Sequence, residues 1–402
     1  MSTEIAIESE VPTFPMRRDS PLDPPPQMLR LLDEQPISRV KLWNGQTPWL
    51  ITRYDDVRAV LASRAFSADV RREGYPKVSA ALATYTEGLI NHLDSPEHDV
   101  YRRMLAPEFM VKRVERLRPE VQATVDSLID AMLAAGPPAD LVSSLAFPFP
   151  ATVTCALMGV PYSEHGYFLS LVEVFLGGTS SAEEAASALG EFREYLGKLI
   201  DDKMTSPTDD VLGHMASVHV ASGACSREAL ITIAQLFLIA GFDTTINMIV
   251  LGVLTLLEHP DQLAILRSDL SLIPRATDEL LRYLTVTHWG RHKVAIEDVE
   301  IGGQLIKAGD GIIAAQDTAN RDPAVFDEPN VLDVRRDARG HLAFGYGVHQ
   351  CIGAALARIE LEVVYRSILE RFPDLHLAEA VRPEDFKPEA AVYGARRLIV
   401  AW

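Results

Sequence analysis

Cys351 lies in a segment whose residue types could bind a metal or act as a nucleophile. The segment reads HLAFGYGVHQCIGAALARIELEVV, with Gly345, Gly347 and Gly353 close to the cysteine and a helix-like pattern directly after it. A thiolate at the start of a helix is stabilised by backbone N–H groups and the positive end of the helix dipole, and glycines let a backbone approach a flat ligand closely. A soft thiolate also suits iron, and a haem held by cysteine favours O–O cleavage. Local chemistry leaves three interpretations open: a haem-thiolate site, a reactive nucleophile and a glycine-rich phosphate loop, although the last lacks the Lys-Ser/Thr pair of a P-loop.

The other two cysteines of the 402-residue chain have different surroundings. Cys155 stands in the apolar stretch ATVTCALMGV, which predicts core packing, and Cys225 stands in ASGACSRE, which predicts an incidental loop thiol. Three cysteines so far apart do not indicate a disulfide framework or a zinc motif. Such sparse usage is typical of a reducing, cytoplasmic compartment.

A second candidate for chemistry is an acid beside an alcohol in a long apolar segment, from about Ala229 to Leu257. The central run reads Ala240-Gly-Phe-Asp243-Thr244-Thr. The pair is a poor structural choice for an apolar helix, whereas the hydroxyl can hydrogen-bond oxygen and the carboxylate can relay protons from solvent. Gly241 leaves room for the helix to open there. A kinked core helix without a chemical role is the alternative interpretation.

The same segment is long enough to span a bilayer, but we expect a buried core helix. Gln235, Asp243 and Asn247 interrupt the apolar run, and an aspartate at the centre of a bilayer is costly. The N-terminal sequence MSTEIAIESEVPTFPMRR also has no apolar run that resembles a signal peptide. The sequence therefore predicts no membrane partner.

Two pairs of charged side chains occur at helical spacing. His98 and Arg102 lie four residues apart in SPEHDVYRRML, on one face of a predicted helix, where both could pair with an anionic group. Glu279 and Arg282 lie three apart in ATDELLRYL, which also places them on one face. For each pair the simpler interpretation is a solvated helix surface.

Together these segments resemble the cytochrome P450 family, in the expected order along the chain. The run FGYGVHQCIG at 344–353, followed by Ala357-Arg358, is similar to the haem-binding signature of that family. The run AGFDTT at 240–245 resembles its oxygen-activation motif, and the run NRD at 320–322 resembles the segment between the motifs. In this family the Glu-x-x-Arg pair joins a later arginine, here Arg336, in a buried structural network behind the haem.

The resemblance implies haem b (iron protoporphyrin IX) as the cofactor and assigns roles to individual residues. Cys351 would be the metal ligand, Thr244 would hydrogen-bond oxygen, and Asp243 would deliver protons, the last two as catalytic residues. The cofactor-binding residues implied are His98, Arg102, Ala240, Gly241, Lys293, Phe344, Gly345, His349, Cys351 and Gly353.

Lys293 departs from the family pattern, which usually has arginine at this place in GRHKVAIEDVEIGG. A lysine can pair with a haem propionate, although not as a bidentate fork. Arg291 or His292 could take that role instead.

The resemblance also implies a mainly α-helical fold with a small β region, as a single triangular domain over residues 1–402. Residues 1–36, with the run PLDPPP, are expected to form an irregular proline-rich arm. A two-strand hairpin should follow, with Asn44-Gly45 as its turn. Helical patterns cover about 55–62, 114–136, 184–204, 229–257 and 352–371, short strands cover about 292–315, and the tail is strand-rich.

Charge limits the range of partners. The net charge of −18 argues against nucleic acid and anionic membranes. Residues 101–118 nevertheless carry six basic and two acidic side chains, a local charge of 6 − 2 = +4. No flavin or iron–sulfur motif is visible, so electrons should come from a ferredoxin and a ferredoxin reductase, with this basic segment facing the ferredoxin. A solvated helix face is the alternative.

The expected substrate is a small, partly hydrophobic molecule that receives one oxygen atom from O₂ by hydroxylation or epoxidation. The amino-acid sequences of these motifs resemble those of actinomycete enzymes of natural-product biosynthesis. We also expect the protein to be a cytoplasmic monomer. Substrate contacts are expected in about 66–92 and 166–186, and at Ile239, Phe242, Val286, Trp289, Val392 and Tyr393.

Two other functions compete with monooxygenation. Segments such as VKLWNG also resemble fungal nitric oxide reductases of the same superfamily, but those enzymes lack the acid–alcohol pair that Asp243 and Thr244 form here. A non-catalytic protein that binds haem or a carrier-bound substrate is the other possibility.

Overall fold

The computed structural model describes residues 11–79, 89–164, 166–167, 170–171, 174 and 181–402. Its α-helices are α1 (Pro26–Glu34), α2 (Tyr54–Ala62), α4 (Glu97–Leu105), α5 (Val111–Val114), α6 (Arg118–Ala135), α7 (Pro148–Met158), α9 (Ala182–Thr205), α10 (Val211–His214), α11 (Arg227–Glu258), α12 (Pro260–Ser268), α13 (Ile273–Leu284), α14 (Gln316–Ala319) and α15 (Ala354–Arg371). The mainly helical prediction is confirmed.

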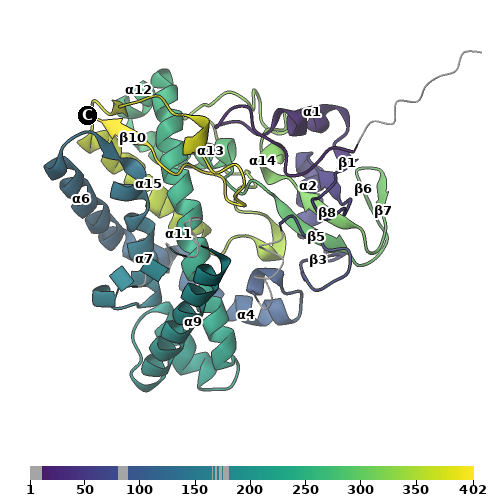
Figure 1. Cartoon of the computed structure of the whole chain (residues 1–402), viewed down its shortest axis with the longest axis horizontal. Helices are drawn as coiled ribbons and strands as arrows, with labels where there is room; N and C mark the ends of the chain where they lie inside the picture. The colour runs from purple at the N-terminus through teal and green to yellow at the C-terminus, as the bar shows by residue number, and fades with distance from the viewer. Residues whose placement is uncertain (1–10, 80–88, 165, 168–169, 172–173, 175–180) are drawn as a thin grey trace, which may run out of the picture.

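The β region is small, as expected. Its strands are β1 (Ile37–Arg39), β2 (Trp49–Ile51), β3 (Phe66–Ser67), β4 (Ala139–Asp140), β5 (Arg291–Ala295), β6 (Val299–Ile301), β7 (Gln304–Ile306), β8 (Gly311–Ala314), β9 (His376–Leu377) and β10 (Ile399–Ala401). The largest sheet has the order β1-β2-β8-β5-β3, in which only β2 and β8 are parallel. Figure 1 shows this sheet with α1 and α2 at one end of the molecule, and α6, α7 and α15 at the other.

Helix α11 passes through the middle of the molecule between these two parts (Figure 1). Ser226 caps its start by accepting a hydrogen bond from the Ala229 N–H at 3.1 Å. The helix is long and apolar enough to cross a membrane, but 61% of its most apolar window is buried inside the protein. An apolar helix that is buried among α7, α9 and α15 is a core helix, so this prediction is confirmed.

Two sequence-based boundaries are wrong. Residues 1–36 are not irregular throughout, because α1 begins at Pro26, where a proline is pre-organised for the first helical turn, and buries Met28 and Leu32. The predicted helix at 114–136 is divided into α5 and α6 by a 3₁₀ turn at Glu115–Leu117. Pro119 stands in the first turn of α6 and cannot donate the hydrogen bond that a continuous helix would require.

The predicted hairpin is confirmed, although its first strand lies earlier than its sequence pattern indicates. β1 pairs with β2 in antiparallel register, from Ile37 opposite Ile51 to Arg39 opposite Trp49. Gly45 closes the turn with a φ of +85°, which favours glycine.

A buried ionic network links α13 to the loop that precedes Cys351. Arg282 donates to both carboxylate oxygens of Glu279, at 2.7 and 2.8 Å, and both side chains are fully buried. Arg336 joins them through an Nε–Oε1 bond of 3.1 Å. Arg282 also donates to the carbonyls of Asn320 and Pro329 at 2.8 and 2.9 Å. The predicted network is confirmed, and it is structural because it connects two parts of the backbone.

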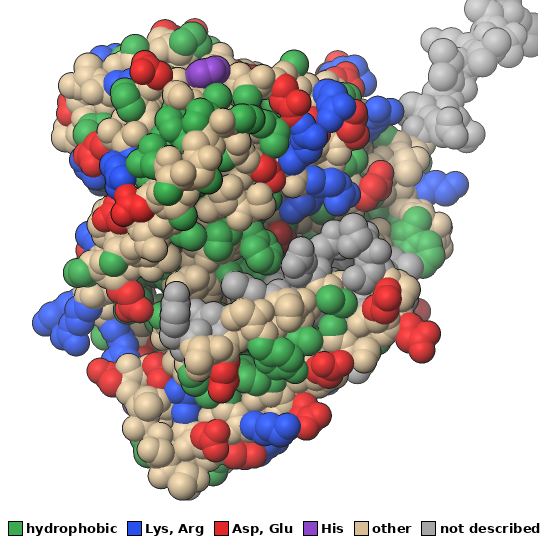
Figure 2. All heavy atoms as spheres, turned by 60° about the vertical axis from the view of Figure 1, so that its left-hand side comes forward, with side chains coloured by type: hydrophobic (Ala, Val, Ile, Leu, Met, Phe, Trp, Pro, Cys, Tyr) green, Lys and Arg blue, Asp and Glu red, His purple; other side chains and the backbone are tan. Residues whose placement is uncertain are grey.

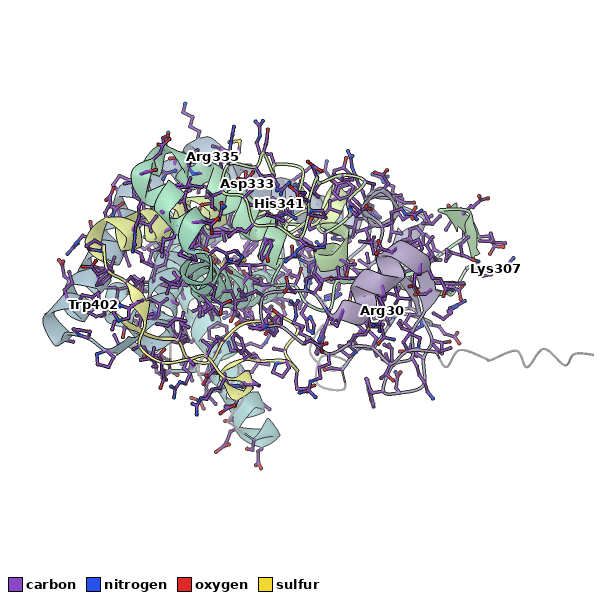
Figure 3. All side chains as sticks on the ribbon, turned by 90° about the horizontal axis from the view of Figure 1, so that it is seen from above. Arg30, Lys307, Asp333, Arg335, His341 and Trp402 are labelled. Carbon is purple, nitrogen blue, oxygen red and sulfur yellow. The ribbon has the colours of Figure 1, made fainter. Side chains whose placement is uncertain are left out.

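We expect Glu279→Gln to destabilise the protein by about 3–5 kcal/mol, because it leaves the buried Arg282 guanidinium without its counter-charge. The measurement is the free energy of unfolding in urea. Arg335→Ala is the matched control, since this exposed neighbour of Arg336 lies at the molecular edge (Figure 3) and should change stability by less than about 0.5 kcal/mol. Equal stability of Glu279→Gln and the native protein would contradict the network's role.

Candidate active site

A large cavity lies between α11 and the loop that carries Cys351. Its empty volume is about 1740 Å³, including the space at its mouth that is open to solvent. The predicted site residues that line it are His98, Arg102, Ala240, Gly241, Thr244, Val286, Lys293, Phe344, Gly345, His349, Cys351 and Gly353. The tertiary structure thus brings together segments that are up to 255 residues apart in the chain.

The loop that carries Cys351 is held by its own backbone. The Cys351 N–H donates to the Phe344 carbonyl at 2.8 Å, which closes the loop. Gly345 and Gly347 have φ values of +75° and +73°, and a Cβ at Gly347 would lie 2.6 Å from the Leu61 carbonyl of α2. Only glycine satisfies both conditions at Gly347. The cysteine then stands just before α15, as predicted, with Gly353 as the N-cap position of that helix.

The charges around Cys351 act in opposite directions on its thiol. Burial raises the pKa of Cys351, while Arg291, the Gly353 N–H, Arg102 and Arg358 lower it. Without a bound metal the burial effect is the largest. A metal ion at the sulfur would deprotonate the thiol outright, so this environment suits a metal ligand better than a free nucleophile.

Cations gather at the cavity without matching carboxylates. Arg102 on α4, and Arg291 and Lys293 on β5, have no carboxylate within ion-pair distance among the residues that the structure describes. Lys293 is 4% exposed, and burial lowers its pKa to about 8. The rings of His98 and His349 lie 4.3 Å apart at the same cavity.

Lys293 is buried, and Arg102 and Arg291 are half-buried. Because unpaired cations with reduced access to water are costly, this group of side chains favours a bound anion. Two carboxylates on a flat molecule, such as the propionates of a porphyrin, fit the donor set. His292 is a weaker candidate for such a contact, because its Nε2 already lies 3.0 Å from the Trp289 carbonyl. Both Lys293 and Arg291 remain available on β5.

Helix α11 presents Ala240, Gly241, Thr244 and Thr245 to the cavity. The Thr244 hydroxyl donates to the Ala240 carbonyl at 3.0 Å, and the Thr245 hydroxyl donates to the Gly241 carbonyl at 3.1 Å. Side-chain bonds of this type occupy carbonyls one turn earlier and loosen the helix locally. Helix α11 is continuous through these residues, so the local opening at Gly241 stays a prediction.

Sequence reasoning missed a polar corner beneath α11. Glu360 on α15 is 1% exposed, and its Oε2 lies 3.4 Å from the Thr245 hydroxyl. The other carboxylate oxygen of Glu360 and the hydroxyl of Thr154 on α7 have no hydrogen-bond partner among the described residues. Burial raises the pKa of Glu360 well above its usual value. The available signal was a glutamate on an apolar face of the last helix, in LARIELEVV.

Several predicted substrate contacts do not line the cavity. Helical periodicity turns Ile239, Phe242 and also Asp243 away from the face formed by Ala240, Gly241 and Thr244, and Phe242 is fully buried in the core. Ile239 and Phe242 are therefore not substrate contacts at the cavity wall, contrary to the prediction. Asp243 stays a candidate for proton transfer, but it does not touch the cavity wall.

Trp289, Val392 and Tyr393 are also corrected. Trp289 packs in a small apolar core with Phe14 and Met28. Val392 forms a bridge with Thr287, and the Tyr393 N–H donates to the Val286 carbonyl at 2.8 Å, but neither Val392 nor Tyr393 lines the cavity. Of the proposed variable regions, residues 80–88, 168–169, 172–173 and 175–180 lie outside the described residues, while Ala68, Ile90 and Asn91 line the cavity.

Comparison with known proteins identifies the family. The family model described as "Cytochrome P450" matches residues 183–398, more than half of the chain. Cytochrome P450-SU2 of Streptomyces griseolus is 44% identical over 95% of this chain and 94% of that protein. Pentalenic acid synthase of Streptomyces avermitilis is 43% identical, with 97% of each chain covered. The crystal structure of GfsF superposes with a TM-score of 0.93 at 41% identity, over 98% of this chain and 100% of that one.

The chain belongs to the cytochrome P450 family. Members of the family bind haem through a cysteine thiolate, and the relatives that this chain matches include hydroxylases and monooxygenases. The cavity fits that cofactor, because it combines one thiol before a helix with unpaired cations for the propionates. In this P450 the haem cofactor that the sequence predicts is therefore confirmed at the level of the family.

We expect Arg102→Leu to release haem about tenfold faster than the native P450, because one charge-assisted hydrogen bond to a propionate is lost. The measurement is haem transfer to excess apomyoglobin. Arg103→Leu is the matched control, since its exposed side chain bonds the Asp99 carbonyl at 3.1 Å and does not line the cavity. Equal rates for the two variants would exclude Arg102 as a propionate contact.

Proposed function

We propose that this P450 inserts one oxygen atom from O₂ into a small, partly hydrophobic substrate, with Cys351 as the haem ligand. The observation that carries the proposal is the shared cavity of Cys351, the unpaired cations and Thr244 of the acid–alcohol motif. The overall reaction consumes O₂, substrate, two electrons and two protons, and produces hydroxylated or epoxidised substrate and, for the second oxygen atom, water.

Each part of the cavity has a defined role in this proposal. The haem, when bound, supplies the activation of O₂. Cys351 holds the iron, and His98, Arg102, His349 and Lys293 or Arg291 hold the propionates. Thr244 positions oxygen through its hydroxyl, and Asp243 carries protons from solvent into the site.

The substrate binds where α11 and the loops above it provide an apolar wall. Leu236 and Phe237 of α11, Ile90 and Val286 line this part of the cavity, and they favour apolar contact. Asn91 and Thr287 add polar groups to the same wall, and the Thr287 hydroxyl is buried without a partner among the described residues. The similarity to pentalenic acid synthase supports a substrate from natural-product biosynthesis.

We expect Cys351→Ser to abolish the absorption band of the ferrous CO complex that a thiolate ligand produces, since a hydroxyl is not a soft, anionic ligand. Cys225→Ser is the matched control, because this thiol lies beside the Ser226 carbonyl at 3.4 Å and outside the cavity. A normal band in Cys351→Ser would show that another group holds the iron. Product formation with the native enzyme then tests the monooxygenase activity itself.

We propose that electrons come from a ferredoxin and its reductase. The ferredoxin would dock on a smaller surface than the whole segment 101–118 that the sequence predicts. Arg113 pairs with Glu108 and Asp209, Arg118 pairs with Glu115 and Glu362, and Arg102 lines the cavity. Arg103, Lys112 and Arg116 are exposed and have no carboxylate partner among the described residues. Elsewhere charges of both signs are mixed, as Figure 2 shows for one face. These three cations support a local docking patch for an acidic protein.

We expect charge reversal at both Lys112 and Arg116 to slow reduction by ferredoxin at low salt and to flatten its salt dependence, because electrostatic steering is lost. Arg30→Glu, on α1, is the control for a change in total charge, because it reverses a charge on an element outside the proposed patch (Figure 3). Stopped-flow reduction rates check the prediction, and equal effects of the two surfaces would contradict it.

We also propose a cytoplasmic location, since the long apolar helix α11 is packed inside the protein. The monomeric state and the single-domain organisation over residues 1–402 stay predictions from the sequence.

A further inference from the structure

Arg18, in the segment before α1, is buried at the junction of two loops, one of which lines the cavity. Its side chain is 5% exposed, and its Nε and Nη2 lie 3.3 and 3.2 Å from His288 Nδ1. The guanidinium also lies over the ring of Tyr393, with its central carbon 4.3 Å from the ring centroid. A single cation thus contacts one side chain from each loop.

The two loops are joined through their backbones. The first, residues 285–290, contributes Val286 and Thr287 to the cavity wall. The second, residues 391–393, forms a β-bridge to Thr287, and the Tyr393 N–H donates to the Val286 carbonyl at 2.8 Å. A displacement of the second loop must therefore also displace the two residues on the cavity wall.

The N-terminal segment holds Arg18 at this junction. Phe14 packs in the same small apolar core as Trp289 of the first loop. Arg18 donates to the Asp23 carbonyl at 2.6 Å, which fixes the guanidinium against its own segment. Asp317 on α14, which is 2% exposed, accepts from Arg18 at 3.5 Å and supplies the counter-charge. The guanidinium is therefore anchored to the fold independently of the two loops.

The contact with His288 requires a neutral imidazole. A guanidinium has donors only, so Nδ1 of the histidine must accept. Burial and the charge of Arg18 lower the pKa of His288 to about 3, which keeps the ring neutral at physiological pH. The flat guanidinium can donate in its plane while its face covers Tyr393, a geometry that the single ammonium of a lysine does not offer. The residue types thus match an arginine at this position.

We propose that Arg18 is a positioning residue for substrate selection, because it fixes the two paired loops and thereby sets the position of Val286 and Thr287 on the substrate side of the cavity. Arg18 acts through His288 and Tyr393 and does not itself line the cavity. The proposal rests on the proposed function, in which this wall contacts the substrate.

The test compares the binding of two azoles of different size to the haem-loaded ferric protein. Imidazole is small, whereas econazole carries two chlorinated aryl rings that extend into the cavity. The measurement is the dissociation constant of each azole from the shift of the Soret band, and it needs no turnover. The free energy of unfolding in urea is measured alongside for every variant.

We expect the double variant Arg18→Met with Asp317→Asn to bind econazole about tenfold more weakly than the native P450, because the wall that the large azole contacts is displaced. Imidazole should bind within about twofold of the native affinity, since it does not reach that wall. Both charges are removed together because Arg18→Met alone would leave Asp317 as an unpaired buried carboxylate.

Asp317→Asn alone is the matched control, because it keeps the contacts of Arg18 with His288 and Tyr393. It should bind both azoles like the native protein. Tyr393→Leu is a second variant that removes the ring beneath the guanidinium without removing a buried charge. It should weaken econazole binding selectively, as the double variant does.

Unchanged econazole binding in both the double variant and Tyr393→Leu would overturn the proposal, whatever their loss of stability. An equal loss of imidazole and econazole binding would also overturn it, because it would show a general disturbance of the haem site. The same holds for a loss of econazole binding in Asp317→Asn. Absence of product from the native P450 would count against the proposed function, whereas the azole comparison still decides the role of Arg18.

Discussion

The buried pair of Glu279 and Arg282 is the interaction on which the position of Cys351 depends. Arg282 uses the donors that Glu279 leaves free to hold the Asn320 carbonyl at 2.8 Å. The Asn320 side chain in turn accepts the Leu342 N–H at 2.7 Å, and the Leu342 carbonyl accepts the Gly345 N–H at 2.8 Å. A fixed charge pair in the core thus sets the start of the loop that ends at the cysteine, through backbone hydrogen bonds and without any contact to the cysteine itself.

The cavity itself is electrostatically incomplete. The unpaired cations Arg102, Arg291 and Lys293 come from α4 and β5, which are more than 180 residues apart, and they converge where the burial of positive charge is costly. A dianionic cofactor removes that cost when it binds, so haem binding and the stability of this region are linked. The thiol of Cys351 shows the same dependence, because burial raises its pKa and a metal would reverse that effect.

Helix α11 separates two functions on its two faces. Ala240, Gly241 and Thr244 form one wall of the cavity, while Asp243 and Asn247 face the loop that contains Lys387 and Gly394. The acid and the alcohol are adjacent in sequence, but about 100° of helical rotation separates their side chains. Proton transfer between them therefore requires a movement of the carboxylate or an intervening water.

Much of the site could be predicted from the sequence because its chemistry is local. The glycines around Cys351, the adjacent Asp243 and Thr244, and the i, i+3 pair of Glu279 and Arg282 are features of short segments. The structure places the glycines and Thr244 at the cavity and joins Glu279 to Arg282, whereas Asp243 does not line the cavity. The core position of α11 also follows from its composition. The boundaries of α1 and α6 could not be predicted from composition, because a proline interrupts a continuous helix but is also accepted in the first turn of a new helix.

Only the tertiary structure decided which residues face the cavity. Phe242, Trp289 and Tyr393 have the apolar composition of substrate contacts, yet packing turns them into the core, while Glu360 and Thr154 reach the polar corner from helices with no motif of their own. The contact of Lys387 with Asn247 joins residues 140 positions apart and depends on the missing side chain of Gly394. The sequence by itself determined the reactive groups and their family, since these depend on neighbours in the chain. The partners of those groups were decided by the fold, because burial and charge act through space.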